Sequence, residues 1–405
     1  MKIVVCGAGV AGLTSALCLH LAGHDVTVLE RAPRIEAVGA GIQLGPNACA
    51  VLGAIGVLTP LLKSAVIPDA LHLCAGHDGR PVFSMPVNQA GGRWRHPYLH
   101  VHRTDLIQTL LDRLLDIAPD SLHLNSPIEH VSSSNGSAVA HAARGDRLNA
   151  DLIIGADGIH SNTRTFVTHE GSATYTGNVA WRAVVATAAL GNLAPPPAAT
   201  VWAGAEQHAV TYQLRNGDLT NLVLVTEQAD WQHENWTQPG EREAMLTRFG
   251  DWHPCLRGII EQTQQCYQWA LLDRPPLQRW YRDRVVLIGD ASHPMLPFMA
   301  QGAAMAIEDA WILASLLGKS GKVADGLLRF QRLRLPRTQR VYQTAKRNER
   351  LFHLRTPLTQ AVTWGGMRVL NATAPKLFPV GLDWLYGYDP VAMYPIKPKT
   401  PQAVT

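Results

Sequence analysis

A glycine-rich turn between two short apolar segments constrains this chain more than any other feature of its sequence. Residues 2–6 are apolar after Lys2, which is typical of a buried strand. The turn Gly7-Ala8-Gly9-Val10-Ala11-Gly12 leads into a helix that we expect to run to about Ala22 and to end at Gly23. Residues 25–29 form a second strand, followed by Glu30. Together these segments predict a βαβ unit of about 30 residues.

The spacing of the three glycines predicts a dinucleotide site. Gly7 permits a sharp turn, Gly9 lets a pyrophosphate approach, and Gly12 lets the helix pack closely on the strand. The helix N-terminus then offers unpaired N–H groups to phosphates. Glu30 follows Gly12 by 18 residues, where it can accept hydrogen bonds from ribose hydroxyls and would repel the 2′-phosphate of NADP. The motif by itself fits FAD and NAD equally, and the alternative is a glycine-rich turn without a ligand.

Two further segments end a buried strand with a carboxylate. Residues 151–161 place Asp157 after one strand, and residues 284–294 place Asp290 after another. Open α/β sheets bind ligands at the carboxyl ends of their strands. A glycine beside each aspartate would let a ligand come close, and Asp290 could bond a sugar or ribityl hydroxyl.

These three motifs, in this order and at these separations, resemble those of the single-component FAD-dependent aromatic hydroxylases, the p-hydroxybenzoate hydroxylase-like class. The resemblance extends from Lys2 to about Pro390. It implies FAD bound non-covalently, NADH or NADPH visiting only as the reductant, and O2 as co-substrate. It also implies the reaction, hydroxylation of a small aromatic or N-heteroaromatic compound through a flavin hydroperoxide.

Finer matches point to the salicylate hydroxylase and 6-hydroxynicotinate 3-monooxygenase branch. Residues 39–47 resemble the segment before the flavin in salicylate hydroxylase-like enzymes, and residues 294–310 and 384–389 are similar to those of the nicotinate enzyme. Arg103 resembles the arginine that reaches the FAD pyrophosphate; the alternative is an ordinary helix start capped by Thr104. The implied cofactor-binding residues are Gly7, Gly9, Ala11, Gly12, Glu30, Arg31, Gln43, Arg103, Ile128, Asp157, Asp290, Pro297, Gly302 and Ala303.

The segment 302–310 begins a helix with small residues. These residues would let backbone N–H groups approach the pyrimidine edge of the flavin, and the positive helix end would stabilise the anionic reduced flavin. The alternative is that small residues merely permit close helix packing. Both readings can hold together.

His208 and Tyr212 are the catalytic candidates. Four residues apart on an expected strand, they would share one face at a separation of about 13 Å. Their spacing resembles that in 3-hydroxybenzoate 6-hydroxylase and 6-hydroxynicotinate 3-monooxygenase, where the pair helps deprotonate or orient the ring hydroxyl. A phenolate attacks an electrophilic oxygen better than a phenol, and an imidazole suits such a base. The alternative is two exposed strand residues without a chemical role.

The chain departs from the nicotinate enzyme at three places that we expect near the pocket. Phe298 and Gln43 stand where that enzyme has histidines, and Ala199 stands where it has a cysteine. These differences predict a more apolar pocket and leave the flavin chemistry unchanged.

The expected fold is α/β: a Rossmann-like FAD-binding domain with a parallel sheet, an interleaved β-rich substrate domain and a helical C-terminal region. Expected elements include an Asn135-Gly136 hairpin turn, helices over 104–115, 241–249 and 302–317, and a long helical region interrupted by Pro336. The FAD-binding domain is assigned to residues 1–70, 98–174 and 275–330, the substrate domain to 71–97 and 175–274, the C-terminal helices to 331–390, and a fraying tail to 391–405.

Composition excludes several other classes. With 46% apolar and 17% charged residues the chain cannot be a disordered one, and a net charge of +4 is too small to indicate nucleic acid or a membrane surface. The six cysteines form no C-x-x-C pair, which favours free thiols in a reducing compartment, and we therefore expect a cytoplasmic protein. His20 with His24, and His100 with His102, are expected to be structural, so no metal site is predicted. Relatives are often dimers, which makes a homodimer one expectation.

Two rival functions remain at this stage. One is an FAD-loaded binding or sensor protein without catalysis. The other is a flavoprotein oxidoreductase of another reaction type. A disulfide reductase would carry a C-x4-C pair near the flavin, and a halogenase a Trp-x-Trp-x-Ile-Pro signature; the sequence contains neither.

Overall fold

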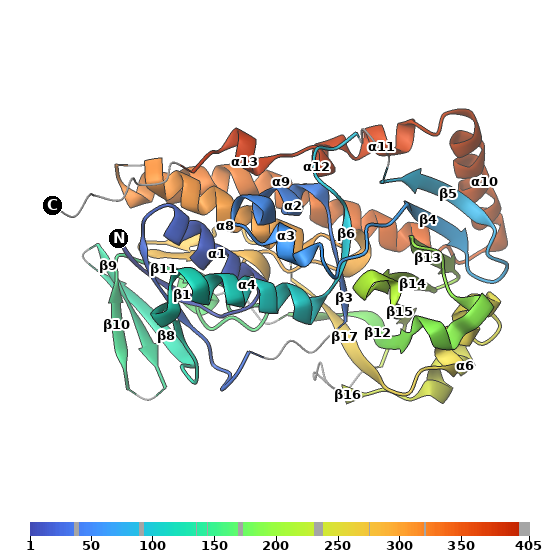
Figure 1. The fold of residues 1–405 in the computed structure, drawn as a ribbon, viewed down its shortest axis with the longest axis horizontal. Helices are drawn as coiled ribbons and strands as arrows, with labels where there is room; N and C mark the ends of the chain where they lie inside the picture. The colour runs from blue at the N-terminus through green and yellow to red at the C-terminus, as the bar shows by residue number, and fades with distance from the viewer. Residues whose placement is uncertain are drawn as a thin grey trace.

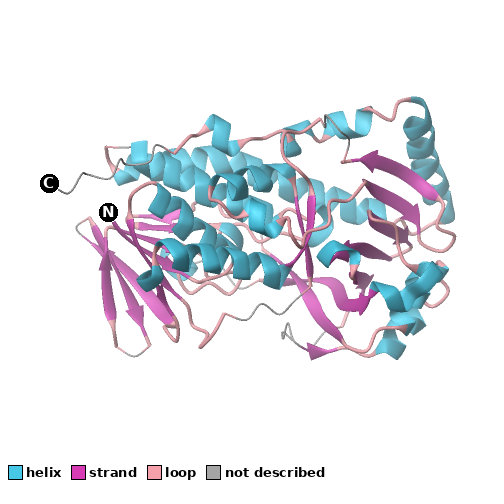
Figure 2. Ribbon diagram, viewed as in Figure 1, coloured by secondary structure: helices cyan, strands magenta, loops and turns pink. Residues whose placement is uncertain are grey.

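Two large sheets organise the computed structural model of this chain (Figure 1). The structure describes residues 1–35, 40–88, 93–134, 136–143, 145–168, 173–230, 238–274, 276–319 and 321–396. Figure 2 shows strands gathered toward both ends of the molecule, with helices packed between and above them.

The first sheet has six strands and is parallel except at one edge. In spatial order the strands are β18 (Tyr281–Arg282), β19 (Val285–Leu287), β11 (Leu152–Gly155), β1 (Lys2–Cys6), β2 (Asp25–Leu29) and β7 (Leu122–His123). Only β18 runs antiparallel to its neighbour. The central strands are buried on both faces, which explains their continuous apolar sequences.

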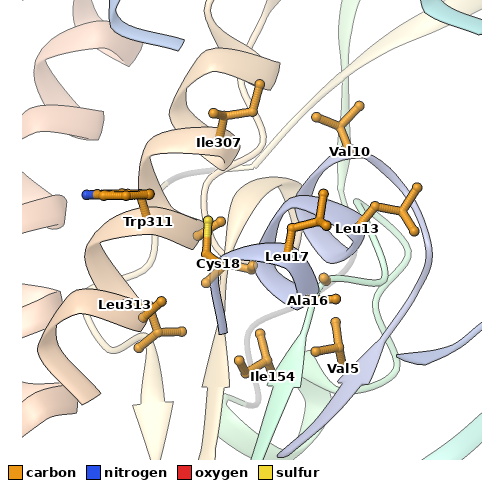
Figure 3. Packing of buried hydrophobic residues seen from close by; sticks show 14 of the residues in the cluster. Val5, Val10, Leu13, Ala16, Leu17, Cys18, Ile154, Ile307, Trp311 and Leu313 are labelled. Carbon is orange, nitrogen blue, oxygen red and sulfur yellow. The ribbon is translucent and has the colours of Figure 1, made fainter. Parts of the chain in front are cut away.

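Helix α1 (Val10–Leu21) packs between this sheet and helix α8 (Gly302–Lys319). Figure 3 shows its apolar side chains beside Val5 and Ile154 of the sheet and beside the α8 helix that carries Ile307. Because α1 is buried almost all round, its sequence is apolar on every face. This packing holds the start of α1 at the carboxyl edge of the sheet.

The second sheet has eight strands. In spatial order they are β16 (Gln238–Pro239), β17 (Cys266–Asp273), β12 (Thr174–Ala186), β15 (Leu219–Glu227), β14 (Gln207–Leu214), β13 (Ala199–Gly204), β4 (Ala70–Ala75) and β5 (Pro81–Pro86). All neighbours are antiparallel except β13 and β4. Helices α6 (Arg242–Phe249) and α7 (Pro254–Glu261) cover one face, and α9 (Val323–Phe352) packs on the other.

Two smaller sheets complete the strands. A three-stranded meander forms from β8 (Ile128–Ser134), β9 (Ser137–Ala142) and β10 (Arg147–Ala150), with Gly136 at φ +82° in the predicted hairpin turn. Asn135 of that turn, like Gly39 of the segment 39–47, lies outside the described residues. β3 (Gly41–Leu44) pairs with β6 (Leu99–His102).

The remaining helices are short or peripheral. They are α2 (Pro46–Ala54), α3 (Leu58–Leu61), α4 (Arg103–Ile117), α5 (Arg164–Val167), α10 (Pro357–Thr373), α11 (Leu377–Gly381), α12 (Asp383–Tyr386) and α13 (Pro390–Met393). The 3-10 turns are η1 (Pro119–Ser121), η2 (Thr187–Leu193), η3 (Arg215–Gly217), η4 (Gly289–Ala291) and η5 (Pro297–Met299). Across the described residues, the model contains no helix with the length and apolar character needed to span a membrane.

The predicted interruption at Pro336 is wrong, because α9 continues through it. A proline inside a helix removes one hydrogen bond and costs about 3 kcal/mol. Here Arg334 and Arg337, on either side of the proline, both bond Glu308 of α8, at 2.5 Å and 2.7 Å. We attribute the unbroken helix to these buried contacts, which hold both halves against the same carboxylate.

The fraying tail is also corrected in part. Beyond α13 the chain still packs, since the Trp311 indole donates a hydrogen bond to the carbonyl of Tyr394 at 3.0 Å. Residues 397–405 lie outside the described residues. The α/β fold class is confirmed, with its parallel sheet, β-rich second sheet and helical C-terminal region, while the exact domain boundaries stay a prediction.

Candidate active site

The three sequence motifs meet at the carboxyl edge of the parallel sheet. Cys6 of β1 pairs with Gly155 of β11, and Gly155 pairs with Leu287 of β19, so the three strands end side by side. Gly7 has φ +102°, and a Cβ there would lie 2.6 Å from the carbonyl oxygen of Ala156. Only glycine fits this position, both in conformation and in space.

The glycine turn leaves the start of α1 open. The helix N-cap is Gly9, which has no side chain to satisfy the first N–H groups. A Cβ on Gly9 would meet nothing among the described residues within 4 Å, whereas one on Gly12 would lie 1.8 Å from the carbonyl oxygen of Gly7. The turn is therefore tight against protein at Gly12 and open at Gly9, as an anion site at a helix N-terminus requires.

Glu30, directly after the neighbouring strand β2, holds this turn in place by hydrogen bonds. Its carboxylate accepts hydrogen bonds from the backbone N–H of Ala8 at 2.8 Å and of Ala32 at 3.0 Å. Each carboxylate oxygen has a second lone pair, so these bonds leave capacity for a ligand hydroxyl. Arg31, beside it, is exposed.

Asp157 is engaged by its own turn. The hydroxyls of Ser161 and Thr163 and the backbone N–H of Thr163 all donate to its carboxylate. Gly155, two residues before Asp157, serves close packing between strands, because a Cβ there would lie 2.7 Å from a methyl group of Leu287. A Cβ on Gly158, directly after Asp157, would meet nothing among the described residues within 4 Å, so the expected approach of a ligand at that glycine stays a prediction.

Asp290 keeps an exposed surface, although many protein atoms surround its carboxyl group. Desolvation raises the pKa of its carboxyl group, while the charges of His293 and Arg103 act in the opposite direction. A Cβ on Gly302 would lie 4.0 Å from its Oδ1 atom, and one on Gly289 would lie 3.2 Å from the Ala11 methyl group. Small residues thus let the starts of α1 and α8 and the end of β19 converge on this carboxylate.

Arg103 approaches the same place from α4. Its charge acts on both Asp290 and Arg182. Its backbone N–H donates to the carbonyl of Ala40, and its side chain is exposed. The N-cap of α4 is His102 and Thr104 lies inside the helix, so the alternative of Thr104 as the N-cap residue is wrong.

The other predicted cofactor residues differ in exposure. Pro297 is exposed, whereas Gln43, Ile128, Gly302 and Ala303 are half-buried. The amide oxygen of Gln43 accepts a hydrogen bond from the Tyr98 hydroxyl at 2.6 Å. The carbonyl of Ile128 accepts one from the side chain of Asn162 at 2.9 Å.

A buried ion network that the sequence did not indicate lies beneath the Asp290 turn. Asp309 accepts hydrogen bonds from the backbone N–H of Gly289 at 3.0 Å and from Arg334 at 2.7 Å, and lies 2.6 Å from a ring nitrogen of His293. The neighbouring Glu308 is likewise fully buried. Burial alone would raise the pKa of both carboxyl groups, but attraction to Arg334 and Arg337 lowers that of Glu308, and attraction to His293 and Arg334 lowers that of Asp309. Two acids inside an otherwise apolar helix were the available signal.

The inner face of the eight-stranded sheet carries an apolar floor. Four side chains form a row of cross-strand neighbours on this face: Val201 on β13, Val210 on β14, Val223 on β15 and Arg182 on β12. All four are only half-buried although they lie in the middle of the sheet. Side chains at such positions normally pack fully, so this row indicates space above the sheet for a flat apolar group.

His208 and Tyr212 flank Val210 on this same face. They are 2% and 4% exposed, so the alternative of two exposed strand residues is wrong. Burial lowers the pKa of His208 well below its ordinary value and raises that of Tyr212. The Tyr212 ring packs against Gly41 of β3, whose backbone N–H donates to the side chain of Asn221 at 2.8 Å. These contacts tie the floor to the segment that was expected beside the flavin.

Arg182 is a candidate that the sequence did not indicate. Its guanidinium carbon lies 4.5 Å from the centre of the Trp269 ring. Its Nε atom is buried and has no hydrogen-bond partner among the described residues. Desolvation lowers its pKa to about 10, which leaves it a cation at neutral pH. In the described part of the chain no group of three or more potential metal ligands gathers.

Comparison with known proteins agrees with this geometry. The FAD binding domain family matches residues 1–345. 3-Hydroxybenzoate 6-hydroxylase of Klebsiella oxytoca is 32% identical over 393 residues, covering 96% of this chain and 97% of that protein. 6-Hydroxynicotinate 3-monooxygenase of Bordetella bronchiseptica is 32% identical over 391 residues, covering 96% and 95%. A salicylate hydroxylase substrate complex has a similar fold, with a TM-score of 0.82 at 23% identity over 99% of this chain and 98% of that one.

The fold, with its parallel sheet beside a second, β-rich sheet, is that of the salicylate hydroxylase structure, and the family match and the relatives add that the chain is a flavoprotein of the aromatic hydroxylase type. The chain belongs to the FAD binding domain family, and within it to the FAD-dependent aromatic-ring monooxygenases, which use NADH or NADPH and O2. The predicted family, fold and FAD cofactor are thereby confirmed.

Proposed function

We propose that the substrate is a small aromatic or N-heteroaromatic ring that carries both a hydroxyl group and a carboxylate. The observation that carries this proposal is one face of the second sheet, where a row of half-buried valines lies between His208 and Arg182. A flat apolar ring matches the valines, a hydroxyl matches the histidine, and an anion matches the arginine. The relatives named above act on hydroxybenzoate and hydroxynicotinate, which have these groups.

The FAD site in this proposal is the edge where the three motifs meet. The open N–H groups after Gly9 and the cation Arg103 would bind the pyrophosphate. Glu30 would accept from ribose hydroxyls, and Asp290 from the ribityl chain. The remaining predicted residues, Gly7, Ala11, Gly12, Arg31, Gln43, Ile128, Asp157, Pro297, Gly302 and Ala303, would shape or line the same site. When bound and reduced by NADH or NADPH, FAD supplies O2 activated for electrophilic attack on the ring.

His208 acts as the base toward the ring hydroxyl in this proposal, and Tyr212 orients the ring. Burial keeps the His208 imidazole neutral, which leaves a lone pair to accept the proton. Removing that proton makes the ring electron-rich at the moment of attack. Phe298, whose ring centre lies 5.3 Å from that of His208, keeps water away from the base.

Arg182 would hold the carboxylate of the substrate. Its Cα atom lies two strands from that of Val210, about 10 Å across the sheet. That span matches a ring with substituents on two sides. Because the Nε–H group is buried and none of the described residues accepts from it, an incoming carboxylate would satisfy it.

Reduction and product assays test the proposed function. Purified protein should be yellow, retain FAD and oxidise NADH or NADPH faster when a hydroxybenzoate or hydroxypyridine carboxylate is added, with a product heavier by one oxygen atom. An FAD-loaded sensor would bind such compounds without faster nicotinamide oxidation. A flavoprotein of another reaction type would oxidise NADH without adding oxygen to the ring.

The cellular compartment and the oligomeric state are also part of the proposal. All six cysteines are buried and free, which favours a reducing compartment such as the cytoplasm. A homodimer stays a prediction, and sedimentation would test it.

A further inference from the structure

A chain of titratable side chains leads from His208 to the protein surface. Nδ1 of His208 lies 2.7 Å from Nε2 of His353, the residue that ends α9. Nδ1 of His353 lies 3.3 Å from Oε1 of Glu227 on β15. The His353 side chain is 3% exposed and the Glu227 side chain 32% exposed. Three side chains therefore connect a buried imidazole to solvent in unbroken hydrogen-bond contact.

The surroundings of the two rings differ sharply. His208 packs against Phe298 and Phe352, so His353 is its only titratable contact among the described residues. His353 instead faces charges, because Glu227 lies beside it and Arg355 acts on it electrostatically. The inner end of the chain is thus apolar and the outer end is charged.

At the outer end, Glu227 belongs to a small surface cluster. Arg355 donates to Glu227 at 2.5 Å and lies 3.3 Å from Glu206, which also acts on His353. Glu349 lies one helical turn before His353, and its backbone carbonyl accepts a hydrogen bond from the His353 N–H at 3.0 Å. The charge of Glu227 acts on the Glu349 carboxyl group. Water reaches these groups directly, so a proton arriving at Glu227 can leave the protein.

The order of donors and acceptors follows from the carboxylate. As a carboxylate beside Arg355, Glu227 only accepts, so Nδ1 of His353 carries the hydrogen. Nε2 of His353 must then accept from Nδ1–H of His208. Burial lowers the pKa of both imidazoles, which keeps both rings neutral with one hydrogen each. Nε2 of His208 is consequently left with a free lone pair, and among the described residues no group donates to it.

We propose that His353 and Glu227 form a proton relay that carries the hydroxyl proton of the substrate from His208 to solvent. The relay rests on the proposed function of His208. In it the O–H bond of the ring hydroxyl breaks and the proton joins Nε2 of His208. The Nδ1 proton of His208 passes to Nε2 of His353, and the Nδ1 proton of His353 passes to Glu227 and then to water.

No electrons are gained or lost in these steps. Run in reverse, they return a proton to the oxygen of the product and restore both tautomers. His353 does not touch the substrate in this scheme; it is a positioning residue that acts through His208.

The tautomers provide a test that needs no substrate. Nitrogen NMR of the FAD holoenzyme labelled at histidine, at about pH 7.5, should show His208 and His353 as neutral rings protonated on Nδ1. Spectra of His208→Gln and His353→Gln assign the two signals. Glu227→Gln should disturb the His353 tautomer, because an amide can donate as well as accept. A His208 protonated on Nε2, or a His353 protonated on both nitrogens, would overturn the relay.

Proton release upon binding tests the movement itself. When 3-hydroxybenzoate or 6-hydroxynicotinate binds to the oxidised holoenzyme in weak buffer with a pH indicator, one proton should appear as fast as the flavin spectrum changes. His353→Gln should slow its release by about 100-fold and leave Kd nearly unchanged, since the base remains but its outlet is lost. Imidazole added to His353→Ala should restore fast release.

His141→Gln serves as the control and should behave like the native enzyme. His141 belongs to a stacked pair of histidines in the three-stranded meander. Release at the native rate in His353→Gln would contradict the relay. If neither compound changes the flavin spectrum nor releases a proton from the native enzyme, the proposed function fails instead, and the tautomers alone decide the relay.

Discussion

The guanidinium of Arg182 stacks over the ring of Trp269, with its carbon 4.5 Å from the ring centre, while its Nε atom lies buried without a hydrogen-bond partner among the described residues. A cation held over an aromatic face keeps its charge while its N–H groups stay available. Arg182→Met should therefore preserve the fold and raise the KM for carboxylated substrates by about 10- to 150-fold, the equivalent of a charged hydrogen bond of about 1.5–3 kcal/mol.

Steady-state kinetics with paired substrates check this prediction. A phenol without the carboxylate should bind equally well to Arg182→Met and to the native enzyme. Arg215→Met, which removes an exposed arginine paired with Asp105, is the matched control and should leave the KM unchanged. Equal losses for both substrates would mean that Arg182 serves the fold.

Gly9 separates cofactor binding from stability. An alanine there meets nothing among the described residues within 4 Å, so the apoprotein of Gly9→Ala should have the Tm of the native apoprotein. If the FAD pyrophosphate lies against this turn, the added methyl group should raise the Kd for FAD by at least about tenfold, or 1.4 kcal/mol. Fluorescence titration measures it. Gly318→Ala, at an open helical position of α8, should bind FAD normally.

The buried ions under the Asp290 turn are a stability element. Arg334→Met leaves Glu308 and Asp309 without their fully buried cation, which should cost about 3–5 kcal/mol of the free energy of unfolding. Calorimetry should show a much lower Tm. Arg332→Met, at an exposed position of the same helix, should change the Tm little. A neutral result for Arg334→Met would mean that the pair is held by packing alone.

The same carboxylates predict a dependence of stability on pH. The folded-state pKa values of Glu308 and Asp309 are lowered below their unfolded values of 4.5 and 3.8. Their stabilisation is therefore complete above the unfolded pKa values and is lost as the pH falls toward the lower folded values. Acid unfolding of the native apoprotein should accelerate in that window, and Arg334→Met should lose much of this dependence. A native protein equally stable across that window would contradict it.

His208 controls how turnover depends on pH. Because burial lowers its pKa, the base stays unprotonated below pH 6.5, and the acid limb of kcat should lie under that value. His208→Gln should lower kcat by about 100- to 10,000-fold near neutral pH, with partial recovery at alkaline pH where the phenol ionises unaided. His141→Gln, whose ring lies far along the chain in the meander, is the control. A variant whose deficit is the same at every pH would exclude the role as a base.

The local elements of the fold followed from the sequence with few errors. The glycine turn, its two strands and the 302–317 helix form where short-range patterns place them, because strand burial and helix capping depend on neighbouring residues. Pro336 was misjudged because the contacts that hold its helix come from α8, which no local pattern reveals. Helix α7 and the parallel pairing of β13 with β4 were likewise missed.

The candidate site divides in the same way. The sequence by itself determined the sheet edge that we propose for FAD, because the conformational freedom of Gly7 and the carboxylates at strand ends follow from consecutive residues. Only the tertiary structure decided that Arg182, His353 and Glu227 join His208, since they come from separate strands and the end of a helix. The residue type at one position does not reveal a contact with a residue 145 positions away. The register between strands and the packing of α9 on the sheet bring these side chains together.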